Sequence, residues 1–175
     1  MRRIVIGVMG AGDSASAIEV AHARELGERI ATEGWVLLTG GRDAGVMAAA
    51  NEGAKRVHGS LTVGILPFHD SGASLDVDVV IATDLGNGRN NVNILSSDVV
   101  IACGVSGPGT VLEIALALKN HRPLILLDAD RDAVDFFSRI AGKRVAAVRS
   151  PEAAVALARQ LLTGVDGLES PSAAN

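Results

Sequence analysis

Four short, glycine-rich polar segments hold most of the residues that could do chemistry in this chain. They are Gly-Ala-Gly-Asp-Ser at 10–14, Thr-Gly-Gly-Arg-Asp-Ala-Gly at 39–45, Gly-Asn-Gly-Arg-Asn-Asn at 86–91 and Gly-Val-Ser-Gly-Pro-Gly-Thr at 104–110. Each follows a short apolar run. Small residues at such places let a ligand approach backbone N–H groups, and these groups bind anions where they begin a helix. The four segments therefore predict a site for a small phosphorylated ligand.

Segment 104–110 is the strongest predicted phosphate site of the four. It combines backbone N–H groups with the hydroxyls of Ser106 and Thr110, directly before an apolar helix. Glu113 is the only ionisable residue in the first two turns of that helix. Because an unpaired buried carboxylate is costly, we expect Glu113 to face the ligand cleft or a cation. The alternative is an exposed glutamate that the helix dipole favours.

Arg89 is the predicted cationic partner of the ligand, since a guanidinium donates paired hydrogen bonds to phosphate or ribose oxygens. Plain turns without a ligand remain the alternative for segments 10–14 and 39–45, and a solvated arginine remains the alternative for Arg89. The complete set of predicted ligand-binding residues is Gly10, Gly12, Gly40, Gly41, Gly45, Arg89, Asn90, Ser106, Gly107, Gly109, Thr110 and Glu113.

Other kinds of chemistry find little support in the sequence. The four histidines lie in separate predicted elements without the spacing of metal ligands, so we expect no metal site. Cys103 is the single cysteine, which excludes an intramolecular disulfide, and it ends an apolar run that is typical of a buried strand. No serine lies in a G-x-S-x-G sequence, the usual context of a hydrolase nucleophile.

Charge and hydropathy narrow the range of partners. The net charge is −4, and no basic block or set of exposed aromatic residues is present, which argues against a nucleic-acid binder. No apolar run approaches the roughly 18 residues that span a membrane. Arg2, Arg3 and the apolar run 4–9 imitate a short secretory signal, but Gly7 interrupts the run, and a buried first strand explains the same residues. We therefore expect a cytoplasmic protein.

Alternating strand and helix patterns supply the elements that would position these segments. Strands are predicted at 4–8, 35–39, 61–66, 77–82, 99–103, 123–127 and 144–148. Helices are predicted at 14–33, 45–57, 89–95, 109–120 and 132–141, with a last amphipathic helix around 154–161. Asp13 or Ser14 is the expected cap of the first helix. Since 48% of the residues are hydrophobic and only 2% aromatic, the core must be aliphatic, as in sheets that helices cover on both faces.

This pattern predicts an α/β fold with a doubly wound, mostly parallel sheet of about seven strands, in the manner of the Rossmann fold. We expect one domain at 1–163 and a flexible tail at 164–175. Ligands of such sheets bind at the carboxyl ends of the strands, near the point where the strand order reverses. The four polar segments all follow predicted strands. We expect the backbone amides around Gly41 and Gly109 to converge on one shared cavity, with the guanidinium of Arg89 alongside.

Several of these sequence blocks together resemble the LOG-like superfamily of Rossmann-type proteins. The resemblance covers roughly residues 3–128 and depends on short blocks in the right order. The blocks are Thr-Gly-Gly followed by Gly-Val-Met at 39–47, Gly-Ile-Leu-Pro at 64–67, Arg89 ahead of Ser97-Asp98, and Gly-Pro-Gly-Thr-Val-Leu-Glu at 107–113. Several blocks in register are far more specific than a single glycine motif.

Two branches of this superfamily give competing expectations. LOG phosphoribohydrolases cleave the N-glycosidic bond of cytokinin nucleoside 5′-monophosphates, and their catalytic Arg and Glu match Arg89 and Glu113. Their loop reads P-G-G-x-G-T-x-x-E, whereas this chain lacks the Pro-Gly-Gly opening. The second branch contains the molybdenum-cofactor carrier proteins and their bacterial relatives. The segments 6–10, 34–42 and 88–93 of this chain look closer to that branch.

The leading hypothesis is therefore a carrier-type protein with little or no turnover, whose ligand is the molybdenum cofactor or a nucleotide. The resemblance implies that the phosphate lies on the loops 40–45 and 104–110, with Arg89 and Thr110 donating and Glu113 near the sugar or pterin. A LOG-type hydrolase, and a sensor domain that reads a nucleotide, remain the alternatives. The resemblance also implies a homo-oligomer, a dimer or tetramer, that assembles through the helices after the fourth and fifth strands.

Overall fold

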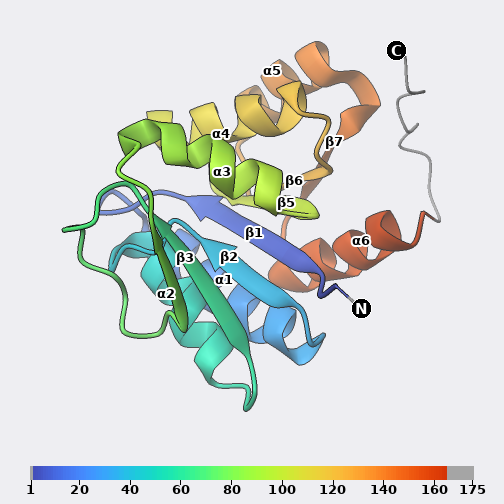
Figure 1. Cartoon of the computed structure of the whole chain (residues 1–175). Helices are drawn as coiled ribbons and strands as arrows, with labels where there is room; N and C mark the ends of the chain where they lie inside the picture. Colours follow the sequence, from blue (N-terminus) through green and yellow to red (C-terminus); the bar gives the residue numbers. More distant parts are fainter. Residues whose placement is uncertain (1, 165–175) are drawn as a thin grey trace.

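The structure, a computed structural model that describes residues 2–164, is built on one seven-stranded parallel sheet between two layers of helices (Figure 1). The strands are β1 (Val5–Gly10), β2 (Val36–Thr39), β3 (Leu61–Leu66), β4 (Val79–Ala82), β5 (Val99–Cys103), β6 (Leu124–Leu127) and β7 (Val145–Val148). Their spatial order is β4-β3-β2-β1-β5-β6-β7. The predicted doubly wound Rossmann-like fold is confirmed.

Six helices cover the two faces of the sheet. On one face lie α1 (Ala17–Thr32), α2 (Gly45–Lys55) and α6 (Pro151–Thr163), and on the other lie α3 (Arg89–Ser96), α4 (Pro108–Lys119) and α5 (Arg131–Ala141) (Figure 1). Two short 3₁₀ turns, η1 (Gly86–Gly88) and η2 (Gly142–Arg144), lead into α3 and out of α5. No helix within residues 2–164 is long and apolar enough to cross a membrane.

The strand order reverses between β1 and β5. From β1 the chain builds outward through β2 and β3 to β4, and it then returns to add β5 on the other side of β1. The connections after these two neighbouring strands consequently leave the sheet on opposite faces. A crevice forms at the carboxyl ends of strands at such a point, where α/β proteins bind their ligands.

The core has two halves, one on each face of the sheet, and both are aliphatic as predicted. Alternate residues of β5 point to opposite sides. Ile101 therefore belongs to the half of the core that includes residues of α1, α2 and α6, while Val100 and Ala102 belong to the half that includes residues of α3, α4 and α5. All three side chains are fully buried. The central strands are thus held rigidly from both sides, which fixes the loops that follow them.

Helices α1 and α2 approach each other unusually closely. A Cβ atom added at Gly27 would overlap the carbonyl oxygen of Ala50, and one added at Gly53 would overlap the carbonyl oxygen of Arg24. The two glycines therefore allow backbone-to-backbone contact between the helices. This contact fixes the position of α2 relative to α1, and with it the loops that begin both helices.

The beginning of α1 differs from the prediction. Its N-cap is Ser16, two or three residues later than the expected caps Ser14 and Asp13. Ser16 and Glu19 form a capping box, in which the serine Oγ accepts from the Glu19 N–H and the glutamate carboxylate accepts from the Ser16 N–H. This reciprocal pair satisfies two backbone donors, which a cap at Ser14 would not have done.

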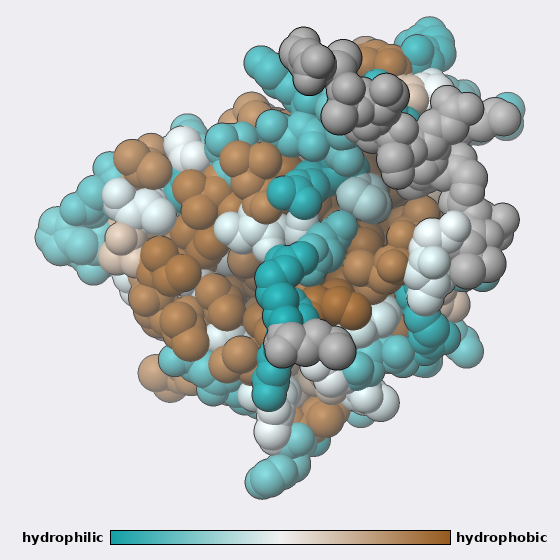
Figure 2. Space-filling model, turned by 45° about the vertical axis from the view of Figure 1, so that its right-hand side comes forward, coloured by the Kyte–Doolittle hydropathy of each residue, from teal (hydrophilic) through white to brown (hydrophobic). Residues whose placement is uncertain are grey.

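The edge strand β4 and parts of the helices carry exposed hydrophobic residues. All four residues of β4 are exposed. Hydrophobic areas lie beside hydrophilic ones on the face shown in Figure 2. Of the predicted tail 164–175, Gly164 ends α6 in the left-handed conformation, and residues 165–175 lie outside the described part of the chain.

Candidate functional site

A pocket of about 200 Å³ opens at the carboxyl end of the sheet, beside the point where the strand order reverses. It is formed by the loops after β1, β2 and β5, by η1 and by the first turns of α2, α3 and α4. The predicted residues that line it are Gly10, Gly12, Gly40, Arg89, Asn90, Gly107, Gly109, Thr110 and Glu113. The fold thus gathers residues from all four polar segments into one cavity.

The first turn of α4 presents unused hydrogen-bond donors in this pocket. Gly107 is the N-cap and has no side chain to cap the helix, and Pro108 at the first position has no N–H. Thr110 is only 2% exposed, and its Oγ1 has no hydrogen-bond partner among the described residues. Because a buried hydroxyl without a partner is costly, and helix beginnings attract anions, this turn is suited to an anionic ligand group.

Two other helix beginnings near the pocket, those of α1 and α2, are more fully used within the protein. The capping box of Ser16 and Glu19 supplies acceptors for the first turn of α1 and places a carboxylate there. The Val46 N–H at the beginning of α2 donates to the Ala11 carbonyl over 2.9 Å. Of these three helix beginnings, that of α4 is therefore the one best suited to a ligand anion.

Arg89 lies in the pocket and is anchored by backbone carbonyls. Its Nη1 donates to the oxygens of Gly40 and Ile65, at 2.6 and 2.7 Å. A Cβ atom at Gly40 would overlap this guanidinium, so glycine is required there for Arg89 to reach its position. Burial lowers the pKa of Arg89, while the nearby Glu113 raises it. Since one nitrogen is committed to the protein, the guanidinium has a fixed orientation in the pocket.

Glu113 lies on the second turn of α4 and lines the pocket, as expected of a carboxylate that is only 7% exposed. Burial raises its pKa to about 7, an effect that the charge of Arg89 and the amide of Asn93 partly oppose. Asn93 is fully buried, and its side-chain nitrogen and oxygen have no partner at hydrogen-bond distance among the described residues. Near neutral pH, Glu113 can consequently either donate or accept a proton.

A second hollow adjoins this pocket and shares Arg42, Asn87 and Arg89 with it. It has a volume of about 530 Å³ and is also lined by Pro67, Phe68, Ser71 and Gly86. Phe68 is half exposed, so its ring offers an open apolar face. Together the two hollows provide a polar, cationic end and a wider end with an aromatic ring, which suits a ligand with an anionic group and a planar group.

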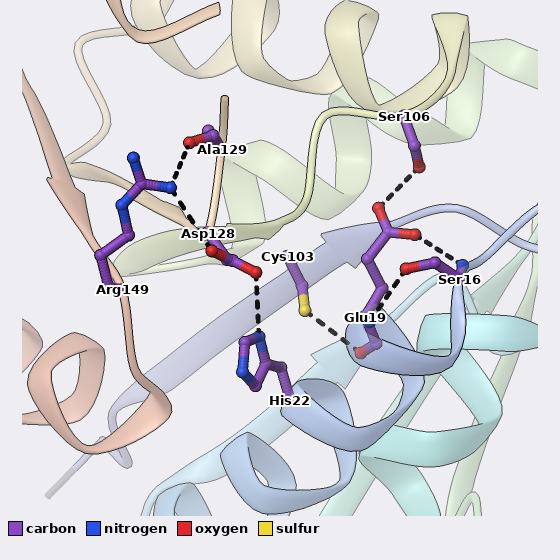
Figure 3. A network of polar contacts seen from close by, with 8 residues as sticks. All are labelled: Ser16, Glu19, His22, Cys103, Ser106, Asp128, Ala129 and Arg149. Carbon is purple, nitrogen blue, oxygen red and sulfur yellow. Dashed lines mark hydrogen bonds and ion pairs between the residues drawn. The ribbon is translucent and has the colours of Figure 1, made fainter. Parts of the chain in front are cut away.

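Three predicted residues do not line the pocket. Gly41 lies in the loop after β2 and packs closely against the backbone of Gly64, and Gly45 begins α2 and packs closely against the backbone of Gly12. Ser106 donates its hydroxyl hydrogen to Glu19 over 2.6 Å instead of facing the cavity (Figure 3). A serine hydroxyl has a single hydrogen, so Ser106 cannot donate to a ligand at the same time.

Sequence reasoning missed other residues that line the pocket, among them Arg42 and Asn87. Both belong to segments that the sequence singled out, so their polar side chains beside glycine were the available signal. Arg42 brings a second positive charge to the site and also pairs with Asp13, with 3.3 Å between its Nη2 and the carboxylate. Glu19 was also missed, although the sequence Ser-Ala-Ile-Glu at 16–19 is a capping-box signature.

Within residues 2–164 the structure shows neither a cluster of metal-binding side chains nor a reactive thiol. No group of three His, Cys, Asp or Glu side chains there could hold a metal ion. Cys103 is fully buried, and burial, with help from the charges of Glu19 and Asp128, raises its pKa to about 12. A thiol with such a pKa is a poor nucleophile at neutral pH.

The chain is similar to known proteins in sequence and in fold. The chain is 49% identical to the molybdenum cofactor binding protein of the phototrophic bacterium Rippkaea orientalis, with a TM-score of 0.90 over 93% of this chain and 99% of that one. It is 44% identical to the molybdenum cofactor carrier protein of Chlamydomonas reinhardtii, with a TM-score of 0.88 and the same coverage. An uncharacterized protein of Archaeoglobus fulgidus is 42% identical over 123 residues, which are 70% of this chain and 78% of that protein.

The family assignment follows from a match over most of the chain. The profile of the SLOG cluster4 family matches residues 3–155, which include all seven strands and every residue of the pocket. The predicted LOG-like resemblance is thereby confirmed, and its closer likeness to the carrier branch agrees with the similarity to a solved cofactor carrier and a solved cofactor-binding protein. This protein belongs to the SLOG cluster4 family.

Proposed function

We propose that this protein is a carrier that binds the molybdenum cofactor, with the phosphate of the cofactor at the beginning of α4. The observation that carries the proposal is the buried hydroxyl of Thr110, which has no partner among the described residues and lies in a pocket with two arginines, Arg42 and Arg89. The similarity to a cofactor carrier and a cofactor-binding protein, at 44 and 49% identity, supports this choice of ligand.

In this proposal the phosphate accepts hydrogen bonds from the Thr110 hydroxyl and from backbone N–H groups at Gly109 and Thr110. Arg89 and Arg42 then supply positive charge at the side of the ligand. The wider hollow next to Phe68 takes the planar pterin, because its ring can stack on the open face of the phenylalanine. Arg42, Asn87 and Arg89 line both hollows and would contact the middle of the ligand.

Glu113 would bind the ligand as a neutral acid at neutral pH and below. With a pKa of about 7, it carries a proton in a large fraction of the molecules and can donate it in a hydrogen bond. An ionised carboxylate at that place would repel the phosphate. Such a group holds a ligand without breaking a bond in it, as a carrier requires.

The direct test is retention of the free molybdenum cofactor by the purified protein. The protein is mixed with the cofactor under anaerobic conditions and passed over a desalting column, and the molybdenum that elutes with it is measured by mass spectrometry. We expect about one equivalent per chain for the wild type and a large loss for Thr110→Val. Ser150→Ala, which removes a hydroxyl cap from α6 outside the pocket, should retain the wild-type amount. A wild-type protein that elutes without molybdenum would overturn the carrier proposal.

A phosphoribohydrolase is the second candidate, because Arg89 and Glu113 line the same pocket. In that case ionised Glu113 would stabilise positive charge at the anomeric carbon while the base leaves. Incubation with nucleoside 5′-monophosphates and chromatography of the products decides between the two functions. Release of free base that disappears in Glu113→Ala would favour the hydrolase, and intact nucleotide after prolonged incubation would favour the carrier.

We also propose that the protein forms a homo-oligomer in the cytoplasm, with α3 and α4 at the contact between subunits. Leu95 on α3 and Val111 and Leu112 on α4 are large hydrophobic residues that are at least 40% exposed in the single chain. Exposed apolar residues on neighbouring helices favour association. Residues at the beginnings of both helices also line the pocket, so assembly would affect the surroundings of the ligand.

A further inference from the structure

We propose that Glu19 is a positioning residue that holds two ligand-binding loops together at the carboxyl end of the sheet. This inference rests on the proposed anion site at the beginning of α4. Glu19 is buried, lies outside the pocket and has side-chain bonds to two different loops. It would therefore act on the ligand through the shape of the pocket and would not touch the ligand itself.

The two carboxylate oxygens of Glu19 have different partners (Figure 3). Oε1 accepts the hydroxyl hydrogen of Ser106 over 2.6 Å, and Oε2 accepts the backbone N–H of Ser16 over 2.7 Å. Ser106 belongs to the loop after β5, and Ser16 ends the loop after β1. Hydrogen bonds to a charged carboxylate are stronger than bonds between neutral groups, so each loop is firmly held.

Both of these loops contribute to the pocket wall. Gly10 and Gly12 come from the first loop, and Gly107 and Gly109 come from the second. The Ala15 N–H donates to the Gly12 carbonyl over 3.0 Å. This bond connects Ser16, which Glu19 binds, to Gly12, the part of the same loop that lines the cavity. Ser106 is directly followed by Gly107, the N-cap of α4. The bond from Ser106 to Glu19 consequently sets where α4 begins.

The backbone of the second loop is built to reach Glu19. Gly104 has a φ of 73°, and a Cβ atom there would overlap the Glu19 carboxylate. The Gly104 N–H donates to Leu127 of the neighbouring strand β6, and the Cys103 thiol lies 3.4 Å from the Glu19 carbonyl oxygen. Glycine is thus needed at 104 both for the left-handed turn and for the close approach of the carboxylate.

The arrangement also explains why the ligand anion is expected at α4 and not at α1. The Glu19 carboxylate already occupies the first turn of α1, where the helix dipole favours a negative charge. A phosphate placed there would meet this charge. The Glu19 carboxylate thus occupies the beginning of α1, while the beginning of α4 has no side-chain cap and stays available to the ligand.

The test uses Ser106→Ala, which removes the bond to Glu19 without touching the pocket wall, and inorganic phosphate as the probe. By isothermal titration calorimetry we expect phosphate to bind about tenfold more weakly. Ordering the loosened loop on binding then costs free energy that the bond from Ser106 to Glu19 supplies in the wild type, about that of one hydrogen bond to a charged group. Amide hydrogen exchange in 104–110, measured without phosphate, should become faster by a similar factor. Ser106→Thr keeps the hydroxyl and should restore both values.

Ser150→Ala is the matched control, because it removes the hydroxyl cap of α6 on a helix away from the pocket. It should lower the unfolding temperature without changing phosphate affinity or exchange at 104–110. Unchanged exchange at 104–110 in Ser106→Ala would overturn the inference. Absence of phosphate binding by the wild type would instead contradict the proposed anion site, and the exchange measurement would still decide whether Glu19 holds the loop.

Discussion

Thr110 is the residue whose surroundings most clearly separate binding from stability. Its hydroxyl is buried and has no partner among the described residues, so it contributes an unsatisfied polar group to the folded protein. Such a group costs about 1–3 kcal/mol when nothing binds to it. A site that accepts this cost without a ligand is typical of function rather than of packing.

For Thr110→Val we expect the free energy of unfolding to stay the same or to rise by up to about 1 kcal/mol, because the unsatisfied hydroxyl disappears at nearly constant volume. Affinity for phosphate should fall about tenfold in the same variant. Chemical denaturation and calorimetry measure the two effects. A clear loss of stability with unchanged affinity would show that Thr110 serves the fold alone.

Glu113 makes the stability of the protein depend on pH around neutrality. Its pKa in the folded protein is about 7, above the ordinary value of 4.5 that it regains on unfolding, because burial penalises the carboxylate. The folded state thus binds this proton more tightly. Its contribution to stability is full below pH 4.5 and is lost as the pH rises through 7.

Between pH 4.5 and 8 we expect the wild type to lose about 3 kcal/mol of unfolding free energy relative to Glu113→Gln. Glutamine has nearly the same shape and does not titrate, so the difference between the two curves isolates this group. Urea denaturation at several pH values is the measurement. Parallel curves would mean that the Glu113 carboxyl has an ordinary pKa in the folded protein.

At the scale of elements, close contact between α1 and α2 holds the first two loops of the site. For Gly27→Ala we expect a loss of about 2 kcal/mol or more, since the added methyl would overlap the Ala50 carbonyl and backbone cannot move aside cheaply. Gly72→Ala is the control, because a Cβ there meets nothing within 4 Å. Thermal unfolding of both variants is the measurement. Equal losses of stability in Gly27→Ala and Gly72→Ala would mean that the close contact at Gly27 contributes nothing of its own.

The elements themselves were predictable from the sequence because their hydrophobic runs and glycine-rich ends are local features. The alternation of strand and helix predicted a parallel, doubly wound sheet, but the order of its strands came only from the structure. The cap of α1 was missed, since Asp13, Ser14 and Ser16 are all good caps and only the pairing with Glu19 selects the last.

The composition of the site was predictable in part. Residues from all four polar segments line one pocket, but which residue of each segment faces that pocket depends on three-dimensional packing. Ser106 donates a hydrogen bond to Glu19, which is 87 positions away in the sequence, so no local sequence pattern could have predicted that bond. Gly41 and Gly45 pack against the backbone of Gly64 and Gly12 and do not line the cavity, whereas Arg42 lines it.

At the scale of the whole molecule, exposed hydrophobic residues on α3 and α4 predict association. We expect the wild type to elute as a dimer or tetramer and Leu112→Glu to shift toward monomer, because a charge at a buried contact is costly. Ile18→Glu, on α1 at the other face of the sheet, should leave the assembly unchanged. Light scattering after size exclusion gives the masses, and a monomeric wild type would refute this contact.

The topology places the beginning of α4 beside the reversal of strand order, and the central claim is that the ligand phosphate binds there. A crystal structure of the protein with the bound molybdenum cofactor tests this most directly. We expect phosphate oxygens at hydrogen-bond distance from the Thr110 hydroxyl and from the backbone N–H of Gly109. A phosphate bound elsewhere on the molecule, with Thr110 still unpartnered, would contradict it.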